Sequence, residues 1–489
     1  MITSRLARRT RFHAALSAAT TVLAVVLGCS STGAPGGTNS YSPSLPSASA
    51  TPPLNASATA TALQAPTAKP TRPPRAASLV VLGPIVTMSE PAVAEALLIR
   101  DGIVAATGDR DEVLALAAGE VPIVDIGENV AYPGFIDAHA HWIGDRGYYD
   151  IDSPAEAMDA AIARGWTSIS EQWVNDERLE ELESLAADDA LPLRVHAYLA
   201  LNGLEVGDYY GDWYADREPG PVDDFLRVQG LKIHLDSGSG AILYWDAETL
   251  NETVDKANEA GWQVSVHAVS TEAQDMVLDA FEAALGPTGR NPLHHRIEHA
   301  LQVTDDQLAR MVALDLATVI QLDGTAYDWV TWAASLEGEA GRDYLSEDVS
   351  WLGRWRDFVD AGLHVAATSD APWFFPDVVL IDDVGRPMDE IAGGMDSRGR
   401  NFPGAPEWML DQLLTAEQGL RAVTVDAAWA LGDETRRGRL AVGTLGDVTI
   451  LSGDITSGTP DEIRALEVIA TIVGGDVAYC SQTDVCKPD

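Results

Sequence analysis

The sequence predicts an α/β protein in which a (β/α)8 TIM-type barrel carries a small β-sandwich domain. Two observations predict the barrel, which we expect over residues 132–437. Apolar, β-branched segments recur along this range, and helical segments lie between most of them. A third observation predicts the smaller domain, because residues 78–131 and 438–480, the two ends of the folded region, both have the pattern of short strands.

The first 28 residues have the features of a bacterial lipoprotein signal peptide. Four arginines precede an apolar stretch from Ala14 to Leu27, which is too short to span a bilayer comfortably. The stretch ends in VVLGCSS, which resembles a lipobox, so we expect Cys29 to carry lipid and to become the mature N-terminus. We therefore expect an exported, membrane-anchored protein of the cell envelope, on its periplasmic or extracellular face.

A disordered tether is expected between this lipid and the folded region, over residues 29–77. Of the 48 residues after Cys29 in this range, 38 are Ser, Thr, Ala, Pro or Gly. Such a composition cannot bury a hydrophobic core. A flexible spacer is the natural interpretation.

The charge of the chain limits its partners. Acidic residues number 74 and basic residues 32, which gives a formal net charge of −42. A surface this acidic repels nucleic acids and anionic membranes. We therefore expect no nucleic-acid partner, and membrane contact through the N-terminal lipid only; the oligomeric state stays open.

The two ends of the folded region carry the signals of the smaller domain. Asp101-Gly102 lies between two apolar runs, which is a strong signal for a two-residue hairpin. Cys480 and Cys486 lie close together near the C-terminus, and in an oxidising compartment we expect them to form a disulfide. A zinc site is the alternative for these cysteines, but no further ligand lies nearby.

The middle of the chain alternates between strand-like and helical segments. Thr271 to Gln274 and Thr304 to Gln307 have the spacing of a capping box at the start of two helices. A doubly wound open sheet is the competing architecture, but no glycine-rich phosphate loop follows a first strand. The strand-like runs after the first are TSIS, LRVHAYLAL, LKIHLD, WQVSVHA, HRIEHA, ATVIQL and HVAATSD.

Polar residues recur at the ends of the expected barrel strands. His139 and His141 are two residues apart in an extended segment, so both side chains point to the same face. A lone histidine in a strand is more often a hydrogen-bonded core residue than a ligand, but barrel geometry brings successive strand ends together. Imidazoles and a carboxylate are the ligands that zinc and similar ions favour. The other members of the set are Lys232 in the fourth strand, His267 in the fifth, His299 in the sixth and Asp370 after the eighth.

Lys232 is unusual in its setting. The chain has only four lysines, and this one lies inside the apolar run LKIHL, where an unpaired ammonium group would be costly. A surface lysine at a strand margin is the alternative interpretation.

Several short sequence motifs, taken in their order along the chain, resemble those of a known family. In order and spacing they resemble those of the amidohydrolase superfamily, and most closely its YtcJ-like branch, amidohydrolase family 3. The resemblance covers about residues 78–480. The segments are PGFIDAHAH, LPLRVHAYL, GLKIHLDSGSG, VSVHAVS, HRIEHA, TSDAPW and LGDVTIL.

The resemblance implies a metal centre with two divalent ions, taken here as zinc. It implies that His139 and His141 bind one ion and that His267 and His299 bind the other. Lys232 is implied to bridge the ions as a carbamate, which would convert a buried cation into an anionic ligand.

The implied activity is hydrolysis of a carbon–nitrogen bond other than a peptide bond in a small-molecule substrate, which would be an amide, cyclic amide or N-acyl compound. Its mechanism would use a metal-activated hydroxide, with Asp370 as ligand and proton shuttle. Hydrolysis of an ester or lactone on the same centre is the nearest alternative. A different class also stays open, a non-catalytic envelope lipoprotein whose barrel binds a ligand.

The chain departs from the family pattern around the substrate. Only about 25 residues separate His141 from the second strand, where relatives usually carry a long insertion. His234 lies two residues beyond Lys232, at a place that is usually apolar or aromatic, and is a candidate for binding substrate. Trp142 and Trp373 adjoin ligand motifs and either line the pocket or pack in the core.

Overall fold

The computed structural model describes most of the chain from Ser78 onward. The described residues are 78–117, 121–149, 151–238, 240–287, 289–322, 351–371, 385–397 and 407–486. The predicted signal peptide, Cys29, the tether and Trp373 lie outside these residues. Within the described ranges, no helix combines the length and the apolar character that crossing a membrane requires. All of the described residues fall within one compact unit.

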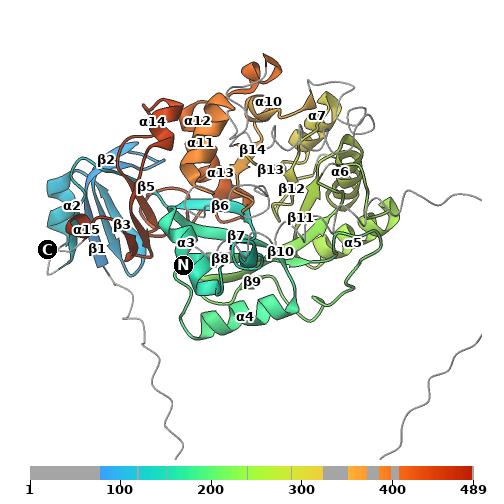
Figure 1. The fold of residues 1–489 in the computed structure, drawn as a ribbon, viewed down its shortest axis with the longest axis horizontal. Coiled ribbons are helices and arrows are strands. Elements are labelled where there is room, and N and C mark those ends of the chain that lie inside the picture. The colour runs from blue at the N-terminus through green and yellow to red at the C-terminus, as the bar shows by residue number, and fades with distance from the viewer. Residues whose placement is uncertain are drawn as a thin grey trace, which may run out of the picture. The chain divides into compact units, whose positions relative to one another are not determined.

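Eight parallel strands form a nearly closed barrel, whose ring can be followed in Figure 1. Their hydrogen-bonded order is their order along the chain, with the short antiparallel β9 (Gly220–Pro221) added beside the fourth strand. The barrel strands are β6 (Phe135–Ala140), β7 (Trp166–Val174), β8 (Arg194–Ala200), β10 (Leu226–His234), β11 (Gln263–Ala268), β12 (Arg296–His299), β13 (Ala317–Ile320) and β14 (His364–Ala367). Their side chains are almost all buried, as expected for parallel strands with both faces covered.

The first and last strands meet through the main chain beyond β14. The amide of His141 donates to the carbonyl of Ala371 at 2.8 Å, and the amide of Asp370 donates to the carbonyl of His139 at 3.2 Å. The segment after β14 therefore lies directly against the end of β6. The barrel predicted from the alternating pattern is confirmed.

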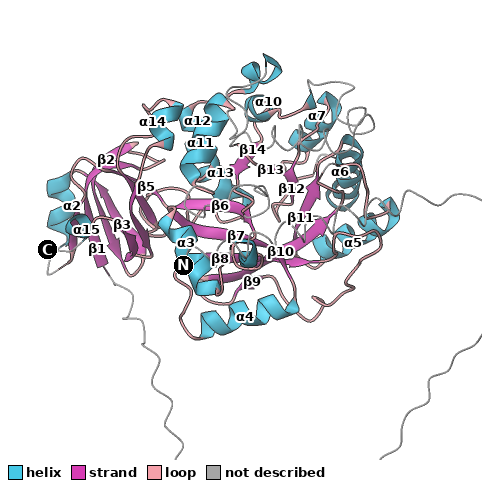
Figure 2. Cartoon of the chain, in the orientation of Figure 1, coloured by secondary structure: helices cyan, strands magenta, loops and turns pink. Residues whose placement is uncertain are grey.

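Helices follow most barrel strands and, in Figure 2, lie around the outside of the ring. The helices of this part are α3 (Pro154–Ala163), α4 (Asp176–Ala187), α5 (Ala247–Glu259), α6 (Thr271–Leu285), α7 (Asp305–Ala313), α10 (Trp355–Asp360), α11 (Pro387–Asp396), α12 (Ala416–Ala422) and α13 (Val425–Ala430), with short 3-10 turns η1 (Arg146–Tyr149) and η4 (Glu407–Gln412). In α6, the apolar residues Val277, Leu278 and Phe281 recur at helical spacing and therefore form one face, which is buried.

One of the two expected capping boxes is correct and the other is wrong. At the start of α7 the Thr304 hydroxyl accepts from the amide of Gln307, and the Gln307 side chain accepts from the amide of Thr304. At α6 the cap is Ser270 rather than Thr271, and its hydroxyl accepts from the amide of Ala273. The Gln274 side chain instead donates to the carbonyl of Ala268, because it is buried against β11.

The two ends of the folded region combine in one eight-stranded sheet. At its centre β15 from the C-terminal end pairs antiparallel with β5 from the N-terminal end. The pairing joins all eight strands in one sheet, so the expected sandwich of two sheets is not confirmed. The strands are β1 (Ser78–Val86), β2 (Val93–Arg100), β3 (Ile103–Gly108), β4 (Ile123–Asp125), β5 (Val130–Pro133), β15 (Val448–Leu451), β16 (Val468–Val473) and β17 (Asp476–Cys480).

Local features of this sheet follow from its sequence. Asp101 and Gly102 join β2 to β3 with positive φ values of 49° and 74°, the conformation for which Asp-Gly is suited. Cys480 at the end of β17 forms a disulfide with Cys486 in α15 (Thr483–Cys486), the pairing expected from the sequence. Helix α2 (Arg110–Ala117) packs beside these strands, and α14 (Pro460–Arg464) packs against α11.

A buried ion pair joins the small sheet to the barrel. Arg194 at the start of β8 donates from Nε and Nη2 to the carboxylate of Asp447, at 2.7 and 2.9 Å. Both side chains are about 5% exposed or less. Burial alone would raise the pKa of Asp447, but the charge and hydrogen bonds of Arg194 outweigh it, so the pKa lies below its ordinary value. The amide of Gly474, beside β16, also donates to this carboxylate at 2.8 Å.

We expect Asp447→Asn to lower the free energy of unfolding by about 3–5 kcal/mol, because it leaves Arg194 buried without a charged partner. A carboxyl with a lowered folded-state pKa stabilises the fold at pH values above its unfolded pKa of about 3.9. That stabilisation should be lost as the pH falls through the folded-state pKa, and the variant should lack this part of the acid transition. Denaturant unfolding at several pH values measures both effects.

The matched control is Asp125→Asn, which breaks the exposed ion pair with Arg110. Both side chains of that pair are about half exposed, so the loss should be at most about 1 kcal/mol. Equal losses for the two variants would contradict the role of the buried pair.

Candidate metal centre

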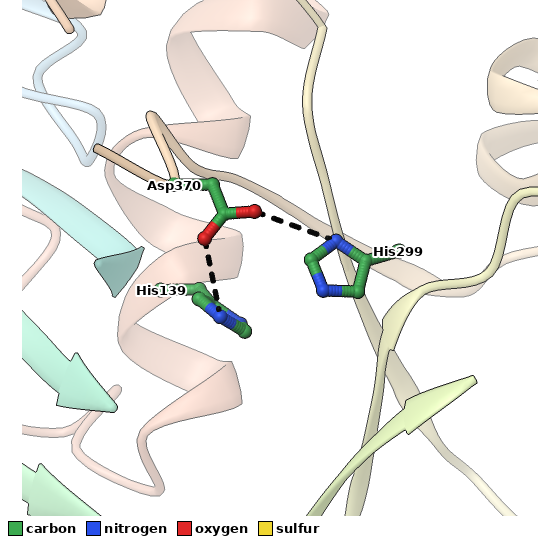
Figure 3. Close-up of side chains that lie close together, drawn as sticks. All are labelled: His139, His299 and Asp370. Atoms are coloured by element: carbon green, nitrogen blue, oxygen red, sulfur yellow. Dashed lines mark ion pairs between the residues drawn. The ribbon is translucent and has the colours of Figure 1, made fainter. Parts of the chain in front are cut away.

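The predicted ligand residues meet at the carboxyl ends of the barrel strands. His139 lies in β6 and His141 immediately follows it, while Lys232, His267 and His299 lie near the ends of β10, β11 and β12. The remaining residue is Asp370, which comes three residues after β14. In Figure 3 the side chains of His139, His299 and Asp370 point toward one another from separate segments of the chain.

The carboxylate of Asp370 lies at the centre of this group. Its Oδ1 atom is 3.4 Å from Nε2 of His139 and 3.5 Å from Nε2 of His141. Its Oδ2 atom is 3.9 Å from Nδ1 of His299. One potential ligand atom from each of His139, His299 and Asp370 lies within 4.8 Å of the others, which is close enough for one ion to contact all three.

His267 and His234 extend the group of imidazoles beyond His299. The rings of His267 and His299 have centroids 4.4 Å apart. His234 stacks on His267 at 4.0 Å, so this residue, which departs from the family pattern, also faces the group. The histidines therefore form a continuous row across the mouth of the barrel.

These imidazoles are in the form that metals bind. Burial, reinforced by neighbouring positive charges, lowers the pKa of His139, His234 and His267 well below the ordinary value. Burial also lowers the pKa of His299. Neutral imidazole carries the nitrogen lone pair that a divalent ion requires, so the residues fit a metal centre.

Lys232 is buried beside the group. Its side chain makes no hydrogen bond to any described residue, and burial lowers its pKa to about 8, against the opposing influence of Glu298 and Asp370. A buried ammonium is costly, so burial favours the neutral form of this side chain. Its position between the two pairs of histidines along the barrel, in β10, suits a shared ligand.

Glu298 orients His139 and was not predicted from the sequence. This fully buried carboxylate accepts from Nδ1 of His139 at 2.6 Å, which leaves the Nε2 lone pair directed toward Asp370. Arg296 and Ser265 each donate to its other oxygen at 2.7 Å. Such a carboxylate–histidine pair fixes the ring and raises its basicity as a ligand.

Gln321, another residue that the sequence did not reveal, lies between His299 and Asp370. Its amide nitrogen is 2.9 Å from Oδ2 of Asp370 and 2.9 Å from Nδ1 of His299. The sequence signal for Gln321 as a site residue was weak, because a glutamine that follows a β-branched strand segment has many ordinary roles. Its contacts hold the Asp370 carboxylate in place.

A buried carboxylate also supports the strand ends behind the ligands. Asp137 accepts from the amide of Ser369 at 3.0 Å and from Nε1 of Trp142 at 3.0 Å. Trp142 is completely buried, so it packs behind the site, which was one of the two roles considered for it. Asp137 therefore connects β6 to the segment that carries Asp370.

Two of the predicted ligand residues have a backbone conformation that is uncommon outside glycine. His299 has a φ of 71° and Asp370 a φ of 45°. Left-handed conformations of this kind cost about 1–3 kcal/mol and persist where the surrounding structure enforces them. Here they turn two side chains into the mouth of the barrel at the points where the strands end.

A model of the amidohydrolase family matches residues 149–479. The chain belongs to the amidohydrolase family. The matched range includes Lys232, His267, His299 and Asp370, and it begins shortly after the two histidines of β6. The superfamily resemblance seen in the sequence motifs is therefore confirmed.

Curated relatives share part of their length with this chain. The YtcJ protein of Bacillus subtilis (strain 168) is 26% identical over 343 residues, which cover 68% of this chain and 57% of the relative. N-substituted formamide deformylase of Arthrobacter pascens is 28% identical over 271 residues, which cover 54% of this chain and 44% of the relative. The chain thus spans about half the length of these relatives.

Solved structures share the fold. A metal-dependent hydrolase from Pyrococcus horikoshii superimposes with a TM-score of 0.62 at 19% identity, covering 78% of this chain and 99% of that one. Molinate hydrolase superimposes with a TM-score of 0.57 at 15% identity, covering 82% of this chain and 95% of that one. Identities this low establish the similarity of fold alone.

We expect Glu298→Gln to weaken metal binding by about 10- to 100-fold, because the neutral amide no longer fixes the tautomer of His139 or raises its basicity. Chelator competition on the folded protein measures the affinity. Glu390→Gln is the matched control, since Glu390 is equally buried but accepts from the amide of Leu322. The control should lose stability without losing metal affinity; the same affinity in both variants would refute the positioning role of Glu298.

Proposed function

We propose that this chain is a metal-dependent hydrolase that cleaves a carbon–nitrogen bond of a small amide, cyclic amide or N-acyl compound. The observation that carries the proposal is the convergence of Asp370 and Lys232 with four buried histidines at the mouth of the barrel. Membership of the amidohydrolase family supports it. A relative named N-substituted formamide deformylase also supports cleavage of this type of bond.

The proposed centre holds two zinc ions. His139 and His141 would bind one ion through their Nε2 atoms, which face the same oxygen of Asp370. His267 and His299 would bind the other. Lys232 would contribute a bridging carbamate, because the neutral amine can add carbon dioxide and its lowered pKa increases the neutral fraction.

The chemistry follows from these positions. A bound divalent ion would lower the pKa of a coordinated water to about 7 and polarise the substrate carbonyl. Asp370 would accept the proton of the water and pass it to the leaving nitrogen. Gln321, donating to Oδ2 of Asp370, leaves Oδ1 directed toward His139 and His141 as the proton-carrying atom.

We expect Asp370→Asn to retain most of the bound metal and to reduce turnover by about 100- to 10,000-fold, because an amide cannot carry the proton. Metal analysis and initial rates on a panel of amides, N-acyl amino acids, esters and lactones measure the two effects. Asp426→Asn is the control, since Asp426 also pairs with a histidine, His364, but at the opposite end of β14. Normal turnover by Asp370→Asn would contradict the proposed shuttle.

We expect Lys232→Ala to lose most of its metal, because the shared ligand is removed. A small carboxylate such as acetate or propionate, supplied in solution, should restore part of both metal content and activity by entering the vacated space. Lys256→Ala serves as the control, because Lys256 is an exposed lysine paired with Asp212. Full metal content in Lys232→Ala, or mass spectrometry showing an unmodified lysine in active protein, would require a mechanism without the carbamate.

A further inference from the structure

A cavity of about 590 Å³ opens beside the metal centre, within the size range of small-molecule sites. Its walls come mainly from the end of β7 and from the segments that follow β7 and β8. The segment after β6 contributes a single residue, Asp145. Aromatic and aliphatic side chains form much of the wall. The described residues that line it are Asp145, Trp173, Asn175, Asp176, Arg178, Leu204, Tyr210 and Trp213.

Two wall residues connect this cavity to the metal centre. The ring of Trp173 lies 5.8 Å, centroid to centroid, from the ring of His234. The Oδ2 atom of Asp145 lies 3.4 Å from Nδ1 of His141. Two residues of the cavity wall therefore lie against histidines at the mouth of the barrel.

The aromatic walls are held in fixed orientations. Nε1 of Trp173 donates to the carbonyl of Asn202 at 2.9 Å, and Nε1 of Trp213 donates to the carbonyl of Ala200 at 2.8 Å. Both carbonyls lie at the end of β8. Because the polar atoms of the indoles are used in this way, their apolar surfaces remain available to a ligand.

The cavity offers no free positive charge among its described residues. Arg178 is its only basic lining residue. The guanidinium donates to the carbonyls of Gly144 and Trp173 at 2.8 and 3.1 Å, and to Asp145 at 2.9 Å. The charge of Arg178 is thus already paired with Asp145, so a substrate carboxylate would find no unpaired cation among the described lining residues, on a chain of net charge −42.

We propose that this cavity binds an aromatic group of the substrate, and that the substrate carries no negative charge. The inference rests on the proposed function, since it places the scissile bond at the metal centre and the ring against Trp173, Tyr210 and Trp213. The substrate class is therefore a neutral or cationic amide with an aromatic substituent, not an N-acyl amino acid with a free carboxylate.

The test uses the full-length metal-loaded protein and three probes that share one amide. N-(2-naphthyl)acetamide carries a neutral ring, 6-acetamido-2-naphthoate adds a carboxylate, and N-methylacetamide has no ring. Stopped-flow quenching of tryptophan fluorescence before turnover gives the affinity of the naphthyl probes, and competition gives that of the third. We expect the carboxylate to weaken binding by about tenfold or more because of like-charge repulsion, and the compound without a ring to bind weakest.

Neighbouring tyrosines supply matched variants. Tyr210 lines the cavity, whereas Tyr209 has a similar exposure but packs on Trp245 at 5.2 Å. Tyr210→Ala should weaken the binding of N-(2-naphthyl)acetamide by about three- to tenfold, the range for one aromatic contact. Tyr209→Ala should leave the affinity for this probe unchanged. Tyr210→Arg should improve binding of 6-acetamido-2-naphthoate relative to the neutral probe, a gain that misfolding cannot produce.

The outcomes separate this inference from the proposed function. Equal affinity for the neutral and carboxylate probes, equal effects of the two alanine variants, or no binding of any naphthyl probe would overturn the inference. Hydrolysis of other amides would then leave the proposed function standing. The expected binding pattern without hydrolysis of any amide would support the aromatic site and count against the proposed function.

Discussion

The parallel arrangement of the barrel strands is the constraint on which the rest of this structure depends. It places the carboxyl end of every strand at one mouth, so residues as distant in sequence as His139 and Asp370 lie 3.4 Å apart. The backbone hydrogen bonds between β6 and the segment after β14 complete this arrangement. They hold the main chain of Asp370 against the end of β6, next to His139 and His141.

Burial makes the mouth suitable for a metal and also makes it costly without one. Desolvation favours the neutral form of His139 and His267, whose nitrogens can then offer lone pairs, and it lowers the pKa of Lys232 to about 8. The carboxylates of Glu298 and Asp370 lie within the same buried space. Arg296 already pairs with Glu298, so a divalent ion would chiefly balance the charge of Asp370.

The sequence predicted what repeats along the chain and missed what depends on contact between strands. The alternation of segments located the barrel, and HxH spacing with later strand-end polar residues located the side chains that converge at its mouth. Glu298 and Gln321 act through neighbours on other strands, which a local pattern does not encode. The cap of α6 was misplaced by one residue because Ser270 and Thr271 are chemically equivalent candidates, and only the burial of Gln274 decides between them.

The metal centre and the cavity are built from different parts of the fold, which explains why the sequence indicated one and not the other. The ligands lie on or next to strands, whose positions the barrel fixes, whereas the cavity walls lie largely in loops whose path no repeating pattern predicts. Arg178 shows the physical link between them. By donating to Gly144, Trp173 and Asp145 it holds the segment after His141 against the end of β7. The same contacts pair its charge, so the residue that shapes the cavity offers no unpaired cation to an anionic substrate, and the other described lining residues include no base.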